Sequence, residues 1–312
     1  MLSFVLRRLL ILVPMLVAIS LAAFALAELS PSDPAEIAIR VNAMVPTPEL
    51  VAETRRALGL DQPFFVRYGD WLSRAVTGDF GSSWVTGLPV AQSLAEALPA
   101  TLALAATALV IILVVSLAAG VASARAENSP LDLALRGFMF LASSMPGFWA
   151  ALLLIWLFSV TLDWLPTSGM RSPESVILPA VTLALSYIGT YMRLIRSEML
   201  RTAHEDWVLF ARGRGLGEAR IMRRMIRNSL RGSAAALGMS IPKLIAGAFV
   251  VETIFAWPGV GRLCVEAVFN RDLPVIVAYV LMMAVLFGVF NLAADIALQL
   301  LDPAERRREE AS

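Results

Sequence analysis

Three side chains that often build metal sites and nucleotide-binding loops are scarce in this sequence. It contains one cysteine, one histidine and one lysine among 312 residues. A lone Cys264 excludes an internal disulfide, and Cys264 with His204 supplies too few thiolate and imidazole ligands for a protein-built zinc or nickel cage. We expect Cys264 to be a small packed hydrophobe and His204 to be a solvated or helix-capping residue.

The single lysine excludes a nucleotide-binding loop in this chain. Lys243 lies between Pro242 and Leu244 in an apolar context, whereas a P-loop places its lysine after glycines and before Ser or Thr. No strand-turn-helix nucleophile motif and no His-Glu-x-x-His occur either. The sequence therefore predicts no catalytic residue, no cofactor-binding residue, no metal ligand and no nucleic acid partner.

Charged residues are also few, and this predicts an all-α integral membrane protein. They make up 16% of the chain against 58% hydrophobic residues, and the mean hydropathy is +0.72. Long apolar runs favour spanning helices over the alternating strands of a barrel. Five charge-free stretches are long enough to cross a bilayer: Leu9–Ala27, Ala97–Ala124, Gly137–Leu162, Ser175–Met192 and Leu273–Ala294.

The distribution of arginine adds a sixth span, Gly232–Phe255, which contains Lys243. Six crossings place every arginine-rich connection on one side, which is the cytoplasmic side for a membrane protein, together with both termini. The segment Glu28–Ala97 falls on the other side, with nine acidic residues against five arginines. The predicted organisation is a retained first transmembrane helix over 1–28, an extracytoplasmic region over 29–97, and a five-helix core over 98–312.

The core contains a cytoplasmic loop, 193–231, with ten arginines and a glycine-rich corner at Gly213–Gly217. Before the corner, His204–Ala211 is predicted as a short helix whose apolar face carries Trp207, Phe210 and Ala211, with Val208 beside them. After it, Glu218–Leu230 is predicted as a helix with arginines on one face and apolar residues on the other. Two short helices at a tight corner indicate a docking knob; the alternative is a basic loop lying on anionic headgroups.

Some residues within or near the predicted spans are candidates for the translocation path. Met145 and Pro146 bend a span, because proline removes a backbone hydrogen bond, and bent helices either line a cavity or only pack. Lys243 and Asp295 are ionisable groups at membrane depth, where charges face protein or water. Packing is the alternative for Lys243, and a helix-end charge is the alternative for Asp295.

An external segment is the candidate for a pore-mouth or partner-docking loop. It combines an aromatic anchor with turn residues, and its alternative is a tryptophan of the interfacial aromatic belt. Its residues are Trp257, Pro258, Gly259, Val260 and Gly261.

The loop sequence resembles the cytoplasmic motif of permease subunits in bacterial ABC importers of the dipeptide, oligopeptide and nickel family. The matching residues are Asp206, Trp207, Val208, Leu209, Phe210, Ala211, Arg212, Gly213, Arg214, Gly215 and Leu216, followed by Arg227–Leu230. In that family the loop forms a coupling helix that binds the ATPase. The family's Glu-Ala-Ala triplet falls on Leu209, Phe210 and Ala211, of which only Ala211 matches, and its glycine is Gly215.

Further motifs extend the resemblance over nearly the whole chain. They are Gly59–Phe64, Gly78–Gly81, Leu98–Leu102, Ser144–Trp149, Glu252–Arg262, Asn270–Val275 and Asp302–Pro303. Several, including Trp164–Pro166 and Phe255–Arg262, look closest to the nickel-permease branch.

The resemblance implies a type I ABC importer permease fold with six transmembrane helices in the bacterial inner membrane. It also implies a second, related permease subunit, two cytoplasmic ATPase subunits that bind ATP and Mg, and an extracytoplasmic solute-binding protein. The implied substrates are nickel or short peptides, and the scarcity of histidine and cysteine suggests that a metal would travel as a chelate. A secondary transporter and a membrane scaffold without ATPase coupling are the alternatives.

Overall fold

The computed structural model describes residues 2–29, 33–41, 44–238 and 240–301. Within these ranges the regular elements are all helical, and one isolated β-bridge joins Ser82 to Pro89. The closing motif Asp302–Pro303 and the arginines at 306–308 lie outside the described residues. The elements are α1 (Leu2–Glu28), α2 (Pro34–Val41), α3 (Pro48–Ala57), α4 (Phe64–Val76), α5 (Val90–Arg125), α6 (Pro130–Ser144), α7 (Gly147–Leu154), the π-helix η1 (Ile155–Thr161), the 3-10 helix η2 (Pro173–Val176), α8 (Ile177–Ala203), α9 (Asp206–Gly213), α10 (Glu218–Gly238), α11 (Ile241–Ile254), α12 (Val260–Asn270) and α13 (Leu273–Leu301).

The chain divides into two compact units, each of which is described by itself. The first comprises 1–100 and 258–288, and the second comprises 101–257 and 289–312. Helices α5 and α13 each pass from one unit into the other.

In the first unit, α1 and α13 approach closely, because a side chain at Gly288 would collide with Leu12. The amphipathic helix α4 covers this pair with Tyr68 and Trp71, both mostly buried, and they pack with Val277 of α13. The hydroxyl groups of Tyr68 and Ser20 lie 2.8 Å apart, which gives the buried ring a polar partner. The predicted extracytoplasmic region 29–97 thus contains a helix, α4, that packs on the first helix.

A second apolar cluster joins the start of α5, α12 and the start of α13. It contains Val90, Leu94, Val260, Ala267, Val275 and Ala278. Beside it, the buried carboxylate of Asp272 accepts hydrogen bonds from the Ser83 hydroxyl and, at 3.1 Å, from the Trp84 backbone N–H. These bonds fix the segment before α5 to the start of α13.

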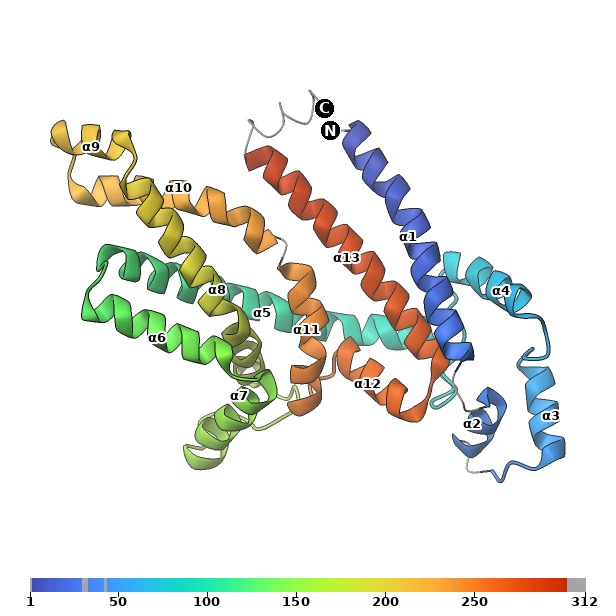
Figure 1. Ribbon diagram of the computed structural model, residues 1–312. Helices are drawn as coiled ribbons and strands as arrows, with labels where there is room; N and C mark the ends of the chain where they lie inside the picture. The colour runs from blue at the N-terminus through green and yellow to red at the C-terminus, as the bar shows by residue number, and fades with distance from the viewer. Residues whose placement is uncertain (1, 30–32, 42–43, 239, 302–312) are drawn as a thin grey trace. The chain divides into compact units, whose positions relative to one another are not determined.

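In the second unit, α8 is the central helix and contacts α6, α7, α10 and α11 (Figure 1). Two glycines permit close approach: a Cβ at Gly189 would lie 2.7 Å from the Met139 carbonyl oxygen, and one at Gly120 would lie 2.9 Å from Ile195. Because these positions leave no room for a side chain, α5 and α6 can pack directly on α8.

Among the described residues, three helices are long and apolar enough to cross a membrane: Val90–Arg125, Pro173–Ala203 and Leu273–Ile296. A fourth candidate is the pair α6 and α7–η1, which is bent by 105°. The predicted span Gly137–Leu162 falls on this pair, and the bend predicted at Pro146 is confirmed, because Pro146 cannot continue the hydrogen-bond ladder of α6. The apolar stretch Leu10–Leu26 of α1 is shorter, and the six-crossing count stays a prediction.

The predicted sixth span, Gly232–Phe255, is divided between two helices. Helix α10 ends at Gly238, and α11 begins at Ile241 with Pro242 in its first turn. Proline is favoured there because the first-turn N–H groups have no partner within the helix. The longest continuous helix within the predicted span is therefore α11, with 14 residues.

Candidate functional site

The predicted coupling loop forms two helices, α9 and α10, joined by a tight turn. Helix α9 begins at Asp206, two residues later than predicted, because His204 ends α8 as its C-cap. The His204 Nδ1 lies 2.8 Å from the Leu200 carbonyl oxygen, in agreement with the predicted capping role. Helix α9 packs on α10 at the end of the α8–α10 pair (Figure 1).

The corner itself depends on Gly215, whose φ is +73°. The chain turns back after α9 through a hydrogen bond from the Leu216 N–H to the Ala211 carbonyl oxygen, at 3.0 Å. Of the three glycines of the corner, Gly213, Gly215 and Gly217, Gly215 alone takes a positive φ. The Arg212 Nε bonds the Glu218 Oε1 at 2.9 Å and links the two sides of the corner.

The apolar face of α9 differs from the predicted one. Val208 and Ala211 are buried, but Phe210 is 69% exposed and Leu209 is 72% exposed. Phe210 was predicted to share one apolar face with Trp207 and Ala211. This is wrong for Phe210, which points outward because Val208 and Ala211 pack on the neighbouring helices. The buried pair joins a cluster that also contains Ile195 and Met199 of α8 and Ile221 and Met225 of α10.

The second helix follows the prediction in its pattern and exceeds it in length. Ile221 and Met225 are buried, and Met222 and Ile226 are partly buried against the same cluster. The arginines of the opposite face are exposed: Arg220, Arg223, Arg224 and Arg227.

A buried carboxylate, Asp132 of α6, binds Arg196 of α8. This residue was not identified from the sequence. Its oxygens accept hydrogen bonds from the Arg196 Nε at 3.0 Å and Nη2 at 2.8 Å, and from the Asn128 backbone N–H at 3.1 Å. The Ser123 hydroxyl completes the set. Asp132 is 0% exposed and therefore joins α6 to α5 and α8 through buried, charge-assisted hydrogen bonds.

A second buried carboxylate, Glu252 of α11, was also missed. The Thr101 hydroxyl of α5 lies 2.6 Å from its Oε1, and both residues are 0% exposed. The signal was present, because Glu252 interrupts the predicted sixth span, where an ionisable group indicates a specific partner.

The segment Trp257–Gly261, which follows α11, is mostly buried, so its tryptophan is not exposed to a partner. Trp257 is 3% exposed, and its backbone N–H bonds the Glu252 carbonyl oxygen at 2.8 Å. Gly259, Val260 and Gly261 are also buried, and Pro258 is exposed.

The candidate path residues lie at breaks and ends of helices. Met145 is the C-cap of α6 and Pro146 the N-cap of α7, so both lie at the 105° bend. Lys243 is exposed in the first turn of α11, and Asp295 is half-buried near the end of the span Leu273–Ile296. The structure does not bring these four residues into one cluster.

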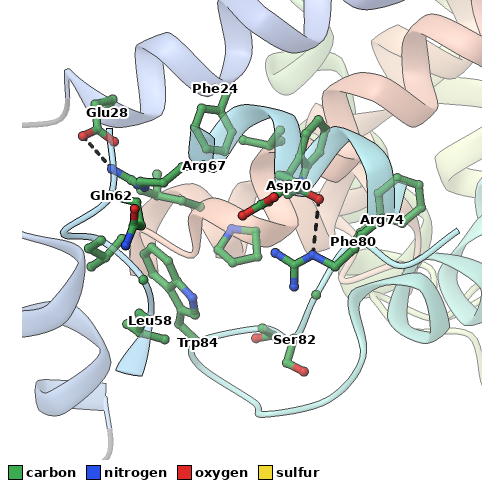
Figure 2. Close-up of a pocket in the computed structure, with 18 of the residues that line it drawn as sticks. Phe24, Glu28, Leu58, Gln62, Arg67, Asp70, Arg74, Phe80, Ser82 and Trp84 are labelled. Atoms are coloured by element: carbon green, nitrogen blue, oxygen red, sulfur yellow. Dashed lines mark hydrogen bonds and ion pairs between the residues drawn. The ribbon is translucent and has the colours of Figure 1, made fainter. Parts of the chain in front are cut away.

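The first unit contains a cavity of about 460 Å³ (Figure 2). It lies between the end of α1, the α3–α4 connection, α4, the segment before α5 and the first turn of α13. Glu28 and Arg67 form an ion pair at 2.8 Å, and Asp70, Arg74 and Trp84 add charges of both signs and an indole ring. This cavity was not predicted, because its lining comes from separate segments of the chain.

Known proteins are similar to this chain over its whole length. Residues 116–307 match the family described as "Binding-protein-dependent transport system inner membrane component", and residues 1–105 match its N-terminal counterpart. The chain is 39% identical over 312 residues to the metal-staphylopine import system permease protein CntB of Staphylococcus aureus (strain NCTC 8325 / PS 47), with all of both chains covered.

Other relatives are named for different solutes. The chain is 35% identical to the oligopeptide transport system permease protein AppB of Bacillus subtilis (strain 168), with 97% of this chain and 99% of AppB covered. It is 36% identical to the glutathione transport system permease protein GsiC of Escherichia coli O1:K1 / APEC, with 98% and 99% covered.

The fold is similar to that of a solved transporter. A chain of the MetNI methionine ABC transporter in inward-facing conformations superposes with a TM-score of 0.58 at 15% identity, covering 68% of this chain and 97% of that one. The chain therefore belongs to the family of binding-protein-dependent transport system inner membrane components, the permease subunits of ABC importers, in which ATP hydrolysis lies on separate subunits.

Proposed function

We propose that this permease imports a metal ion, with nickel as the first candidate, already bound to a small chelator. The observation that carries the proposal is the end-to-end similarity to the metal-staphylopine permease. The composition supports it, because one histidine and one cysteine in the whole chain leave the coordination of a borderline metal to ligands that travel with it.

Short peptides are the second candidate. Relatives named for oligopeptide and glutathione transport cover nearly the whole chain at slightly lower identity. A chelate and a short peptide are both small polar solutes, so one permease architecture serves either.

The proposed assembly has six crossings with both termini in the cytoplasm. Two permease subunits, this chain and a related one, form the path. Two ATPase subunits bind ATP and Mg on the cytoplasmic side, and a solute-binding protein delivers the cargo outside. The support is the positive-inside distribution of arginine and the membership of the family.

Coupling is proposed to run through α9 into α8. Leu209 and Phe210 project from α9 as an exposed apolar pair that suits a cleft in the ATPase. Behind them, Val208 and Ala211 pack on Ile195, so a displacement of α9 is transmitted to α8 rather than absorbed by a flexible loop. Closure of the ATPases would thereby alternate the access of the path.

The remaining site residues keep their proposed places in this scheme. Met145, Pro146, Lys243 and Asp295 are candidates for the translocation path, and exposure of Lys243 leaves its ammonium free to face a water-filled route. The segment Trp257–Gly261 is the candidate pore-mouth loop, with Pro258 as its exposed point.

The proposal is tested by uptake of radioactive nickel into cells that contain the complete importer and no other nickel importer. We expect accumulation when nickel is supplied with staphylopine, and background uptake when it is supplied as the free ion. A competing short peptide should leave nickel uptake unchanged. Equal uptake of free nickel, or accumulation of peptide alone, would contradict the chelate assignment.

A further inference from the structure

We propose that an anionic phospholipid of the cytoplasmic leaflet binds in the groove between α6 and α8, with its phosphate on Arg136 and Arg193. The inference goes beyond transport and assumes the proposed orientation, which puts these helix ends at the cytoplasmic surface. The evidence for it is the shape, the charge and the apolar surface of this groove.

The groove has a volume of about 540 Å³ and lies entirely within the second unit. Its floor is apolar, formed by Met139 of α6 and Met192 of α8, which are 8% and 0% exposed. Gly137 leaves the floor open, because a Cβ at this position would meet no atom within 4 Å. A ligand can therefore enter without displacing packed side chains.

The charge of the groove is positive. Three guanidinium groups line it, those of Arg136, Arg193 and Arg196. The carboxylate that meets them is that of Asp132, which is bound bidentately by Arg196 and lies 3.8 Å from Arg136. Three positive charges against one negative charge leave a surplus of two, carried by the exposed Arg136 and Arg193.

The apolar rim distinguishes a lipid from a free anion. Leu133 and Phe140 border the same groove and are 69% and 66% exposed. A soluble phosphate would use the arginines and leave both side chains uncovered. A phospholipid satisfies both features at once, since guanidinium groups bind its phosphate and the acyl chains cover the apolar rim.

The groove lies next to the part of α8 that supports α9. Arg196 lies at the edge of the groove and is bound by the Asp132 carboxylate. In the same part of α8, Ile195 and Met199 belong to the cluster that supports α9. A lipid bound to Arg136 of α6 and Arg193 of α8 would join the two helices at the base of the coupling loop.

The test uses the assembled importer reconstituted in phosphatidylcholine vesicles that contain a photoactivatable phosphatidylglycerol. After illumination, crosslinked peptides are mapped by mass spectrometry. We expect labelling of both 133–140 and 192–196, and little labelling when the photoactivatable lipid is phosphatidylcholine. Replacing Arg136→Gln and Arg193→Gln should lower the labelling by about fivefold for each arginine removed.

Two further variants separate binding from folding. Gly137→Leu fills the groove without removing a charge and should also abolish labelling, whereas Arg171→Gln removes an exposed arginine outside the groove and should not change it. Unchanged thermal unfolding in detergent confirms that the variants fold. Equal labelling by both lipids, or labelling that survives Arg136→Gln with Arg193→Gln, would overturn the proposal.

The second permease subunit is the other occupant that the test detects. Labelling of the isolated chain that is lost in the assembled importer would show that a protein surface covers the groove, and would also overturn the lipid site. None of these results bears on the metal-uptake assay, so the two proposals fail independently.

Discussion

Gly215 makes the corner of the coupling loop possible, because its φ of +73° is accessible to glycine and costly for most other residues. A left-handed backbone costs an ordinary residue about 1–2 kcal/mol, and more for a β-branched one. The space around Gly215 is open, so the cost of a substitution there comes from the backbone and not from a collision.

Replacing Gly215→Val should therefore open the corner between α9 and α10 and reduce nickel-chelate uptake at least tenfold, while membrane insertion remains normal. The measurement is uptake normalised to the amount of permease in purified membranes. Gly215→Asn should be much milder, because asparagine tolerates the left-handed region.

Gly213→Ala is the matched control for that variant. Gly213 lies inside α9 without a positive φ, and a methyl group there meets no atom within 4 Å. Alanine raises helix propensity, so uptake should be preserved. Normal transport by the Gly215→Val variant would argue against a coupling role for the corner.

Two of the buried carboxylates, Asp132 and Glu252, show what the sequence cannot predict at the scale of the residue. Glu252 lies inside a predicted span, which indicates that it needs a partner, whereas Asp132 precedes one and gives no such signal. The partners, Arg196 and Thr101, are far away in the sequence and become neighbours only after the helices pack. Periodicity cannot identify such pairs.

At the scale of the element, α9 presents two apolar faces, and within the described part of the chain only one of them is buried. Val208 and Ala211 are buried in the cluster with α8 and α10, whereas Leu209 and Phe210 are exposed. An exposed apolar pair of this kind is typical of a protein interface.

Changing Leu209→Ser together with Phe210→Ser should leave the fold intact and weaken assembly with the ATPase. We expect the variant to insert and to unfold thermally like the wild type, but to retain at most about one-tenth of the ATPase in co-purification, as for loss of an interface hot spot worth about 1.4 kcal/mol or more.

Val208→Ser is the contrasting variant, because Val208 is 1% exposed and its loss leaves a polar group in the cluster. This variant should lower the thermal unfolding midpoint before it affects assembly. Full ATPase retention by the Leu209→Ser, Phe210→Ser variant would exclude this face as the docking surface.

The elements also show how far periodicity reaches. It correctly predicted the apolar face of α10, where Ile221 and Met225 alternate with exposed arginines. For α9 it was wrong about Phe210, because apolar residues on both sides of a short helix leave the buried face undetermined. It also missed the break before α11, although Pro242 in the first turn is a recognised start signal.

At the scale of the whole molecule, the helical class and the family could be predicted from the sequence, since long apolar runs and the loop motif extend over most of the chain. The first-unit cavity could not, because it forms between α1, α4 and α13, which are distant in sequence. The number and the orientation of the membrane crossings stay predictions at this scale, and the coupling mechanism and the lipid site both depend on the orientation.

The orientation is tested with single cysteines introduced into a Cys264→Ser background. Glu49→Cys reports on the exposed start of α3, and Arg220→Cys on the exposed face of α10. A membrane-impermeant maleimide should label position 49 in intact spheroplasts and position 220 only after the membrane is permeabilised.

The native thiol provides the control for background. Burial raises the pKa of Cys264 to about 11, so the thiol stays protonated at neutral pH and reacts slowly, because the thiolate is the nucleophile. The wild-type chain should therefore give little signal under the same conditions. Labelling of position 220 from outside the cell would place the corner between α9 and α10 on the external side of the membrane. A cytoplasmic ATPase could not bind it there, and the proposed coupling mechanism would be excluded.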